Sequence, residues 1–153
     1  MSILLEQRLE QDLKKSMLAG DSLRVMTLRN MKSALLNAKV ATGKRETGLT
    51  DEEVFPILSK EAKKRQESAD FYVQGGSQDR ADMELAEKVI IEEYLPKQLS
   101  EAEITAIVDD VIAATNASGL AAMGQVIGQV KAKTGAAAGG SLIAKLVKEK
   151  LAQ

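Results

Sequence analysis

The chain has 153 residues, of which 44% are hydrophobic and only 3% aromatic, and it contains neither cysteine nor histidine. These counts exclude disulfides, thiolate chemistry and every catalytic pair that needs an imidazole. The net charge of −1 provides no overall attraction to a polyanion, and no apolar run approaches the roughly 18 residues of a membrane span. With a charged N-terminus and no signal peptide, the composition predicts a helical, soluble, cytoplasmic protein without a membrane partner.

Apolar residues recur at helical spacing through the first half of the chain. Four helices are predicted there, over residues 2–18, 22–41, 50–74 and 77–94. Thr50 and Glu53 have capping-box spacing at the start of the third helix, and Pro56 is expected to disturb its first turn. The second helix has a wide apolar face, which predicts packing against more than one neighbour. The apolar stripe of the fourth helix is expected to contain Ala81, Leu85 and Val89.

The second half of the chain shows the same kind of pattern in shorter segments. Three helices are predicted, over residues 100–115, 120–133 and 140–151, and Ser100 and Glu103 form a second capping-box spacing. Pro96 ends the fourth helix and marks the best boundary between two parts. No period-2 alternation is long enough for a sheet. We therefore expect an all-α protein with an N-terminal helical bundle at residues 1–95 and a small C-terminal three-helix domain at residues 97–153.

Charge is distributed unevenly along the chain. Residues 21–45 carry six cations and one acid, residues 79–110 carry three cations and ten acids, and residues 131–153 carry five cations and one acid. The basic segments can form a footprint for a polyanion. Alternatively, the aliphatic stems of the Lys and Arg side chains cover apolar helix edges, and the acidic helices pair with the basic ones. Glu61 is expected to pair with Arg65 at i,i+4 spacing on a solvated helix face.

We expect no catalytic residue, no cofactor and no metal ion in this chain. The adjacent acids at 92–93 and 109–110 diverge by about 100° on a helix, so neither pair converges on one substrate atom. The glycine-rich stretch 135–141 lacks the Lys-Ser/Thr ending of a Walker A loop. We interpret it as a flexible connector whose amides are still able to meet a phosphate. Tyr72 and Tyr94 are expected to be half-buried packing residues rather than general acids.

Four stretches of the sequence share a pattern with a known family. They are MTLRNMKSALLNAKV, EEVFPILSKEAKKRQESADFY, EKVIIEEYLPKQLSEAEI, and AMGQVIGQVKAKTG followed by GGSLIAKLVKEKL. Together they resemble the GatB/YqeY family, and most closely its stand-alone YqeY-like members. The resemblance covers nearly the whole chain, and EEYLPKQLSEAE is its most specific part. It implies the same two-part helical fold.

The resemblance also implies a function. In GatB, the tRNA-dependent amidotransferase subunit, the equivalent region is a C-terminal appendage that contacts tRNA. Glutamine hydrolysis and activation of the tRNA-bound acid occur in other parts, which this chain lacks. The family label is carbon–nitrogen ligase activity with glutamine as amido-N-donor. For this chain the label implies an accessory role, and we do not expect the chain alone to be an enzyme. The implied function is a non-catalytic tRNA-binding or amidotransferase-associated module.

The C-terminal turn departs from the family pattern. Relatives place basic residues in a turn that reads like KGRADGK, whereas residues 133–141 here read KTGAAAGGS. The candidate RNA contacts are therefore the lysines that flank this turn: Lys131, Lys133, Lys145 and Lys148. The basic second helix is expected to join them if it lies on the same surface. The alternative is a protein-interaction module that docks on an amidotransferase or an aminoacyl-tRNA synthetase. Gly124 and Gly128 permit close helix contact, although internal packing is their commoner use.

Overall fold

The computed structural model describes residues 4–153, and these residues form seven α-helices and two short 3₁₀ turns without a strand. The prediction of an all-α fold is confirmed. The helices belong to two compact units, a first that ends at Leu95 and a second over Pro96–Gln153.

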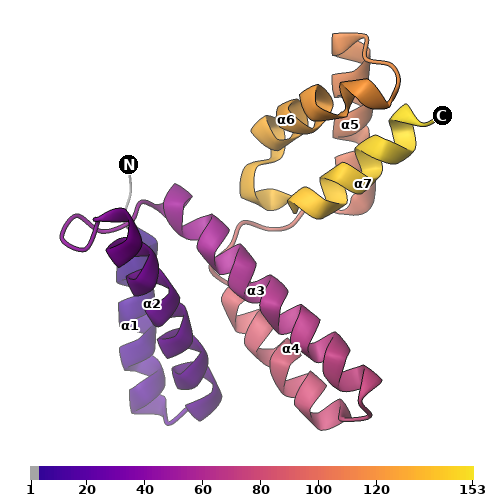
Figure 1. Ribbon diagram of the computed structural model, residues 1–153. Helices are drawn as coiled ribbons and strands as arrows, with labels where there is room; N and C mark the ends of the chain where they lie inside the picture. The colour runs from indigo at the N-terminus through magenta and orange to yellow at the C-terminus, as the bar shows by residue number, and fades with distance from the viewer. Residues whose placement is uncertain (1–3) are drawn as a thin grey trace. The chain divides into compact units, whose positions relative to one another are not determined.

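The first unit consists of two helical hairpins (Figure 1). α1 (Leu4–Ala19) pairs with α2 (Ser22–Thr42), and α3 (Asp51–Gln74) pairs with α4 (Gln78–Glu92). Asp21 caps α2 by accepting a hydrogen bond from the Arg24 N–H at 3.1 Å. Gly43 ends α2 in the left-handed conformation at φ +70°, which glycine adopts without steric cost. Local sequence signals therefore set these helix ends.

The start of α3 is held by the predicted capping box. The Thr50 side chain accepts from the Glu53 N–H at 3.3 Å, and the Glu53 carboxylate accepts from the Thr50 N–H at 2.9 Å. α3 then continues through Pro56 without a break, so the expected disturbance is wrong. Pro56 lies early in the helix and removes only the hydrogen bond to the Glu52 carbonyl, close to the end that the capping box stabilises.

The core of the first unit is aliphatic, as the composition predicts. Its most deeply buried side chains come from three helices and are Leu28, Met31, Val54, Leu58 and Ile91. The stripe predicted for α4 is wrong in one respect, because Val89 is 60% exposed whereas Glu87 is 8% exposed. A charged side chain therefore occupies a position that the apolar pattern had assigned to solvent.

The ion-pair partner of Glu87 explains why Glu87 rather than Val89 is buried on α4. Arg65 of α3 places its Nε 2.7 Å from a Glu87 carboxylate oxygen and 3.9 Å from one of Glu84. The expected pair between Glu61 and Arg65 is wrong, because Glu61 pairs with Lys64 at 3.2 Å. Burial of a charge is tolerated when an opposite charge compensates it, so the ion pair links α3 to α4 inside their interface.

The second unit is a three-helix arrangement of α5 (Glu101–Thr115), α6 (Met123–Thr134) and α7 (Gly140–Leu151), each of which contacts the other two. Ser100 and Glu103 form the predicted capping box of α5. Seven side chains are fully buried between the helices: Ile104, Val108, Val111, Val126, Val130, Ile143 and Val147. Among the described residues, no single helix is long and apolar enough to cross a membrane, whereas the bent pair Glu101–Thr115 and Leu120–Ala137 meets that test by length and composition.

Candidate nucleic-acid interface

Two of the four candidate lysines lie in the last turn of α6. This helix buries Val126 and Val130 against its neighbours and leaves Lys131 and Lys133 exposed. Cations at this end of a helix interact favourably with the helix dipole. Residues two positions apart point to different sides of a helix. Lys131 and Lys133 therefore cannot contact the same phosphate from α6.

The turn after α6 is anchored to the segment that precedes α5. Its Ala137 carbonyl accepts from the Leu99 N–H at 2.8 Å, and its Ala136 carbonyl accepts from the Gln98 side chain at 2.9 Å. Ala138 is 9% exposed, and Gly135 has a φ of +54°. This connector between α6 and α7 therefore follows a path that two long-range hydrogen bonds and the burial of Ala138 determine.

Lys131 reaches from α6 to the first residue of α7. A Cβ placed on Gly140 would lie 3.5 Å from both Cε and Nζ of Lys131. No side chain caps the start of α7, whose N-cap residue is Gly139. The first amides of a helix have no partner within it, and this end carries partial positive charge. The turn thus brings one candidate lysine beside the start of the helix that carries two others.

Lys145 and Lys148 lie on the outer face of α7. They are exposed and three residues apart, on the opposite side from the buried Ile143 and Val147. Lys150 is different, because it pairs with Asp109 of α5 at 3.2 Å. Within the described part of the chain, no ion pair involves Lys131, Lys133, Lys145 or Lys148. Lys131 therefore lies beside the start of α7, Lys145 and Lys148 lie on the exposed side of that helix, and Lys133 lies on another side of α6.

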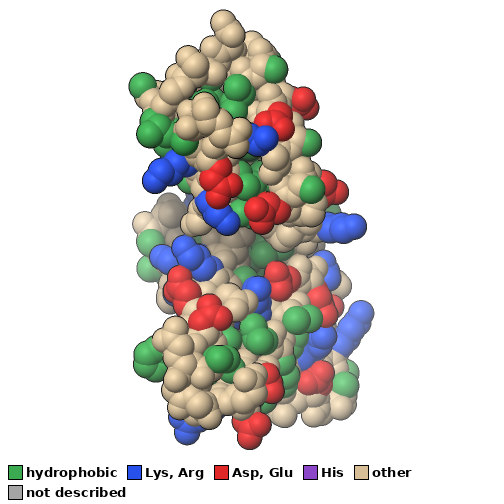
Figure 2. All heavy atoms as spheres, turned by 90° about the vertical axis from the view of Figure 1, so that its right-hand side faces the viewer, with side chains coloured by type: hydrophobic (Ala, Val, Ile, Leu, Met, Phe, Trp, Pro, Cys, Tyr) green, Lys and Arg blue, Asp and Glu red, His purple; other side chains and the backbone are tan. Residues whose placement is uncertain are grey.

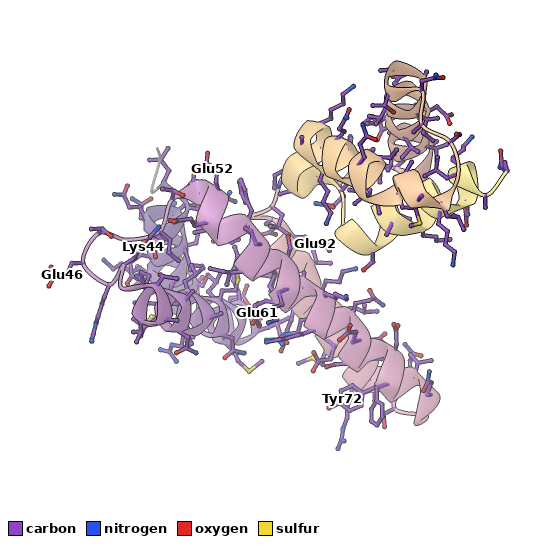
Figure 3. All side chains as sticks on the ribbon, turned by 45° about the horizontal axis from the view of Figure 1, so that its top comes forward. Lys44, Glu46, Glu52, Glu61, Tyr72 and Glu92 are labelled. Carbon is purple, nitrogen blue, oxygen red and sulfur yellow. The ribbon has the colours of Figure 1, made fainter. Side chains whose placement is uncertain are left out.

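The basic segment around α2 is largely neutralised within the first unit. Arg24 pairs with Glu93, Lys32 with Glu10, Lys39 with Glu6 and Lys44 with Glu53. Figure 3 shows Lys44 in the loop that precedes α3. Figure 2 views the molecule from the right-hand side of Figure 1, away from α1 and α2, and on that face basic and acidic side chains are interspersed within each unit. Four of the six cations are thus paired, but only Arg24 pairs with an acid of the segment 79–110, so the expected pairing of the acidic segment with this basic segment is confirmed for that contact alone. With most of its cations paired, α2 adds little to a polyanion footprint.

The EEYLPKQLSEAE segment, which carries the most specific resemblance, contributes structural contacts in each unit. In the first unit, Glu93 accepts two hydrogen bonds from Arg24 at 2.7 and 3.2 Å. In the second unit, Gln98 holds the turn described above, and Ser100 caps α5. These side chains are used for local anchoring. Their hydrogen bonds explain the choice of residue types without a catalytic role.

Glu93 gives the first unit a specific pH dependence. The hydrogen bond from Arg24 lowers the Glu93 pKa below its ordinary value of 4.5, against a smaller opposing effect of burial. A carboxylate with a lowered folded pKa adds stability above the unfolded pKa and loses it as pH falls through the folded pKa. We expect Glu93→Gln to flatten the fall of unfolding free energy below pH 4.5. Urea denaturation of the Glu93→Gln variant and of the unaltered protein across that pH range tests this expectation. Parallel curves of unfolding free energy against pH would contradict it.

Tyr94 is the residue that sequence reasoning misplaced most clearly. It is 2% exposed rather than half-buried, and its hydroxyl donates to a carboxylate oxygen of Asp12 on α1. The Arg8 guanidinium lies 4.4 Å from the ring centroid. Burial, reinforced by the Asp12 carboxylate, raises the pKa of the Tyr94 hydroxyl. Tyr72 is half-buried as expected and lies toward the far end of α3 from Glu52 (Figure 3).

Acidic residues and exposed glycines provide no further site. Among residues 4–153, no group of three or more acidic side chains has the arrangement needed to hold a metal ion. Gly124 and Gly128 are exposed on α6, and a Cβ on either would meet nothing within 4 Å. Their interpretation as internal packing positions is therefore wrong. The exposed lysines of α6 and α7 remain the strongest candidate site in the second unit.

Comparison with known proteins agrees with the resemblance seen in the sequence. Residues 6–151 match the family described as Yqey-like protein. The chain belongs to the YqeY-like family. This family is related to the C-terminal region of GatB. The curated relatives include "Altered inheritance of mitochondria protein 41, mitochondrial" from two yeasts. The protein from Vanderwaltozyma polyspora is 34% identical over 87 residues, and that from Lachancea thermotolerans is 34% identical over 107 residues.

The YqeY-like chain matches only part of these relatives. The alignments cover 57% and 68% of this chain, and 46% and 56% of the two yeast proteins. The chain thus spans about half of the length of the curated relatives it matches. The relatives are named as mitochondrial proteins, which contradicts the cytoplasmic location expected from composition. Composition failed here because a compartment is specified by targeting signals rather than by the folded domain.

Proposed function

We propose that this YqeY-like protein is a non-catalytic RNA-binding module whose second unit contacts the phosphate backbone of tRNA. The observation that carries the proposal is a set of three exposed lysines that make no ion pair within residues 4–153: Lys131 beside the start of α7, and Lys145 and Lys148 on the outer face of that helix. The resemblance to the tRNA-contacting appendage of GatB supports tRNA as the polyanion. It also supports an accessory role beside a tRNA-dependent amidotransferase, which would supply the chemistry.

The physical form of this binding follows from the residues available. Lysine is a point charge that contacts phosphates without reading bases, and the second unit has no aromatic residue on which a base could stack. Binding should therefore depend on the shape and backbone of the RNA rather than on its sequence. The anchored turn at residues 135–138 contributes geometry, because it brings Lys131 to the start of α7.

We expect replacement of Lys131, Lys145 and Lys148 by glutamine to weaken tRNA binding strongly. Each phosphate contact contributes about 0.7–0.9 to the slope of log affinity against log salt, so the triple variant should lose about 2 units of slope. Filter binding of total tRNA between about 50 and 200 mM salt measures this change. An unchanged slope, or no binding by the unaltered protein at low salt, would contradict the proposal.

Lys133→Gln is the matched control for these three substitutions. It removes an exposed lysine from the same unit but from a different side of α6. We expect it to change the salt slope by less than any of the other three single variants. If Lys133→Gln has the largest effect, the contact face lies around α6, and the assignment to α7 is wrong.

A further inference from the structure

α2 presents a second apolar face in addition to the one in the core. Leu28, Met31 and Leu35 form the buried face, each at most 3% exposed. On another side of the helix, Leu36 is 42% exposed and Val40 is 59% exposed. The wide apolar face seen in the sequence predicts more than one neighbour for α2, and this is confirmed, because α2 contacts α1, α3 and α4. Within the described residues, Leu36 and Val40 stay largely exposed in spite of these contacts.

The exposed face continues into a groove at the end of the α1–α2 hairpin. This shallow groove has a volume of about 500 Å³ and is lined by seven residues: Met17, Gly20, Ser22, Val25, Met26, Arg29 and Asn30. Met17 is 52% exposed, and Met26 is 44% exposed. Along α2, Val25, Leu36 and Val40 lie on one side of the helix. The α2 strip, defined as Met17, Val25, Met26, Leu36 and Val40, is about 22 Å long from Val25 to Val40.

Two cations beside the α2 strip make no ion pair within the described part of the chain. Arg29 lines the groove and is exposed, and no ion pair involves it within residues 4–153. Lys14 is also exposed and makes no ion pair within residues 4–153. It lies one helical turn from Glu10 on α1, and Glu10 pairs with Lys32 of α2 at 2.7 Å. Lys14 therefore borders the same side of the hairpin. These two cations differ from Arg24 and Lys32, which pair with Glu93 and Glu10.

We propose that the α2 strip docks an acidic amphipathic helix of another protein. An apolar stripe of about four helical turns would match the length of the strip, and flanking carboxylates would face Arg29 and Lys14. The flexible side chains of Met17 and Met26 can adapt to a partner surface. A second copy of this chain would instead bring two positive surfaces together. RNA would satisfy the cations but leave the apolar strip uncovered.

Two synthetic peptides of about 18 residues test the chemistry of the partner. Both carry leucines at i, i+3, i+4 and i+7 spacing; one has flanking glutamates and the other has lysines at the same positions. Fluorescence anisotropy with the full chain and no RNA should show at least tenfold tighter binding of the glutamate peptide. Arg29→Glu should remove that preference, and the double variant Lys14→Glu with Arg29→Glu should reverse it. Met26→Ser should weaken binding of the glutamate peptide about fivefold.

Met83→Ser is the matched control, because Met83 is 51% exposed on α4, outside the strip. It should leave peptide binding unchanged. Equal binding of both peptides, or an effect of Met83→Ser as large as that of Met26→Ser, would overturn the proposal. So would self-association that Met26→Ser abolishes in analytical ultracentrifugation, or sedimentation with anionic phosphatidylglycerol vesicles that depends on Met26. Because the assay contains no RNA, its outcome is independent of the tRNA proposal.

Discussion

Replacing Tyr94 by alanine is expected to lower the free energy of unfolding by about 4 kcal/mol. The ring is 2% exposed and belongs to the core cluster of the first unit. Its removal leaves a cavity and also removes the hydroxyl that donates to Asp12 and the ring under Arg8. Urea denaturation of the full chain measures the loss. Hydrogen exchange should show faster opening of α1 and α4 than of α5, α6 and α7.

Tyr94→Phe separates the ring from the hydroxyl. It retains the buried ring and removes only the hydrogen bond to Asp12, so its expected cost is about 1 kcal/mol. The Asp12 side chain is 29% exposed, which allows water to replace the lost donor. If Tyr94→Phe is as destabilising as Tyr94→Ala, the hydroxyl rather than the packing of the ring holds this cluster together. Equal stability of Tyr94→Ala and the unaltered protein would contradict the burial described.

Replacing Glu87 by alanine is expected to cost about 3 kcal/mol at neutral pH, because it removes the nearer of the two carboxylates that compensate the largely buried Arg65 guanidinium. The Arg65 side chain is 17% exposed and that of Glu87 is 10% exposed. Arg65→Met combined with Glu87→Leu should recover most of this loss, since apolar side chains of similar volume avoid the desolvation cost. Urea denaturation of the two variants measures both effects. A double variant as unstable as Glu87→Ala would show that packing rather than charge dominates.

Lys64→Ala is the control for this ion pair. Lys64 also pairs with a glutamate, Glu61, but its side chain is 53% exposed. Exposed ion pairs contribute little, so the expected cost is below about 0.5 kcal/mol. A loss comparable to that of Glu87→Ala would mean that burial does not distinguish the two pairs.

The pH dependence of Glu87 has the opposite sign to that of Glu93. Burial raises the pKa of Glu87 above its ordinary value of 4.5, and the charge of Arg65 opposes this only in part. The folded state therefore binds the proton more tightly than the unfolded state does. The contribution of Glu87 to stability falls as pH rises from 4.5 through the folded pKa and is constant above it. Glu87→Gln should remove this decline, whereas Glu93→Gln acts below pH 4.5.

The exposed faces of the two units have different chemistry. Around α7, three exposed lysines make no ion pair within residues 4–153, which suits a phosphate backbone. Beside α2, exposed methionine and aliphatic side chains accompany Arg29 and Lys14, which suits a protein helix.

The sequence by itself determined the helical class and the positions of the helix ends. Thr50 with Glu53 and Ser100 with Glu103 form the predicted capping boxes, and Gly43 ends α2. These features were predictable because a cap depends on backbone groups within three or four residues of the side chain. The aliphatic composition likewise specified a helical core. Exposure of the candidate lysines followed from the apolar periodicity of α6 and α7.

Only the tertiary structure decided which polar groups meet. Glu87 is buried and Val89 is exposed because Arg65, 22 residues earlier in the chain, lies on the facing helix. Gln98 determines the path of the glycine-rich turn through a carbonyl 38 residues later. Four of the six cations around α2 are paired with acids of α1 and α3 and with Glu93, which directly follows α4. Helical periodicity describes one helix at a time, whereas these contacts depend on the orientation of two segments in space, which no short stretch of sequence specifies.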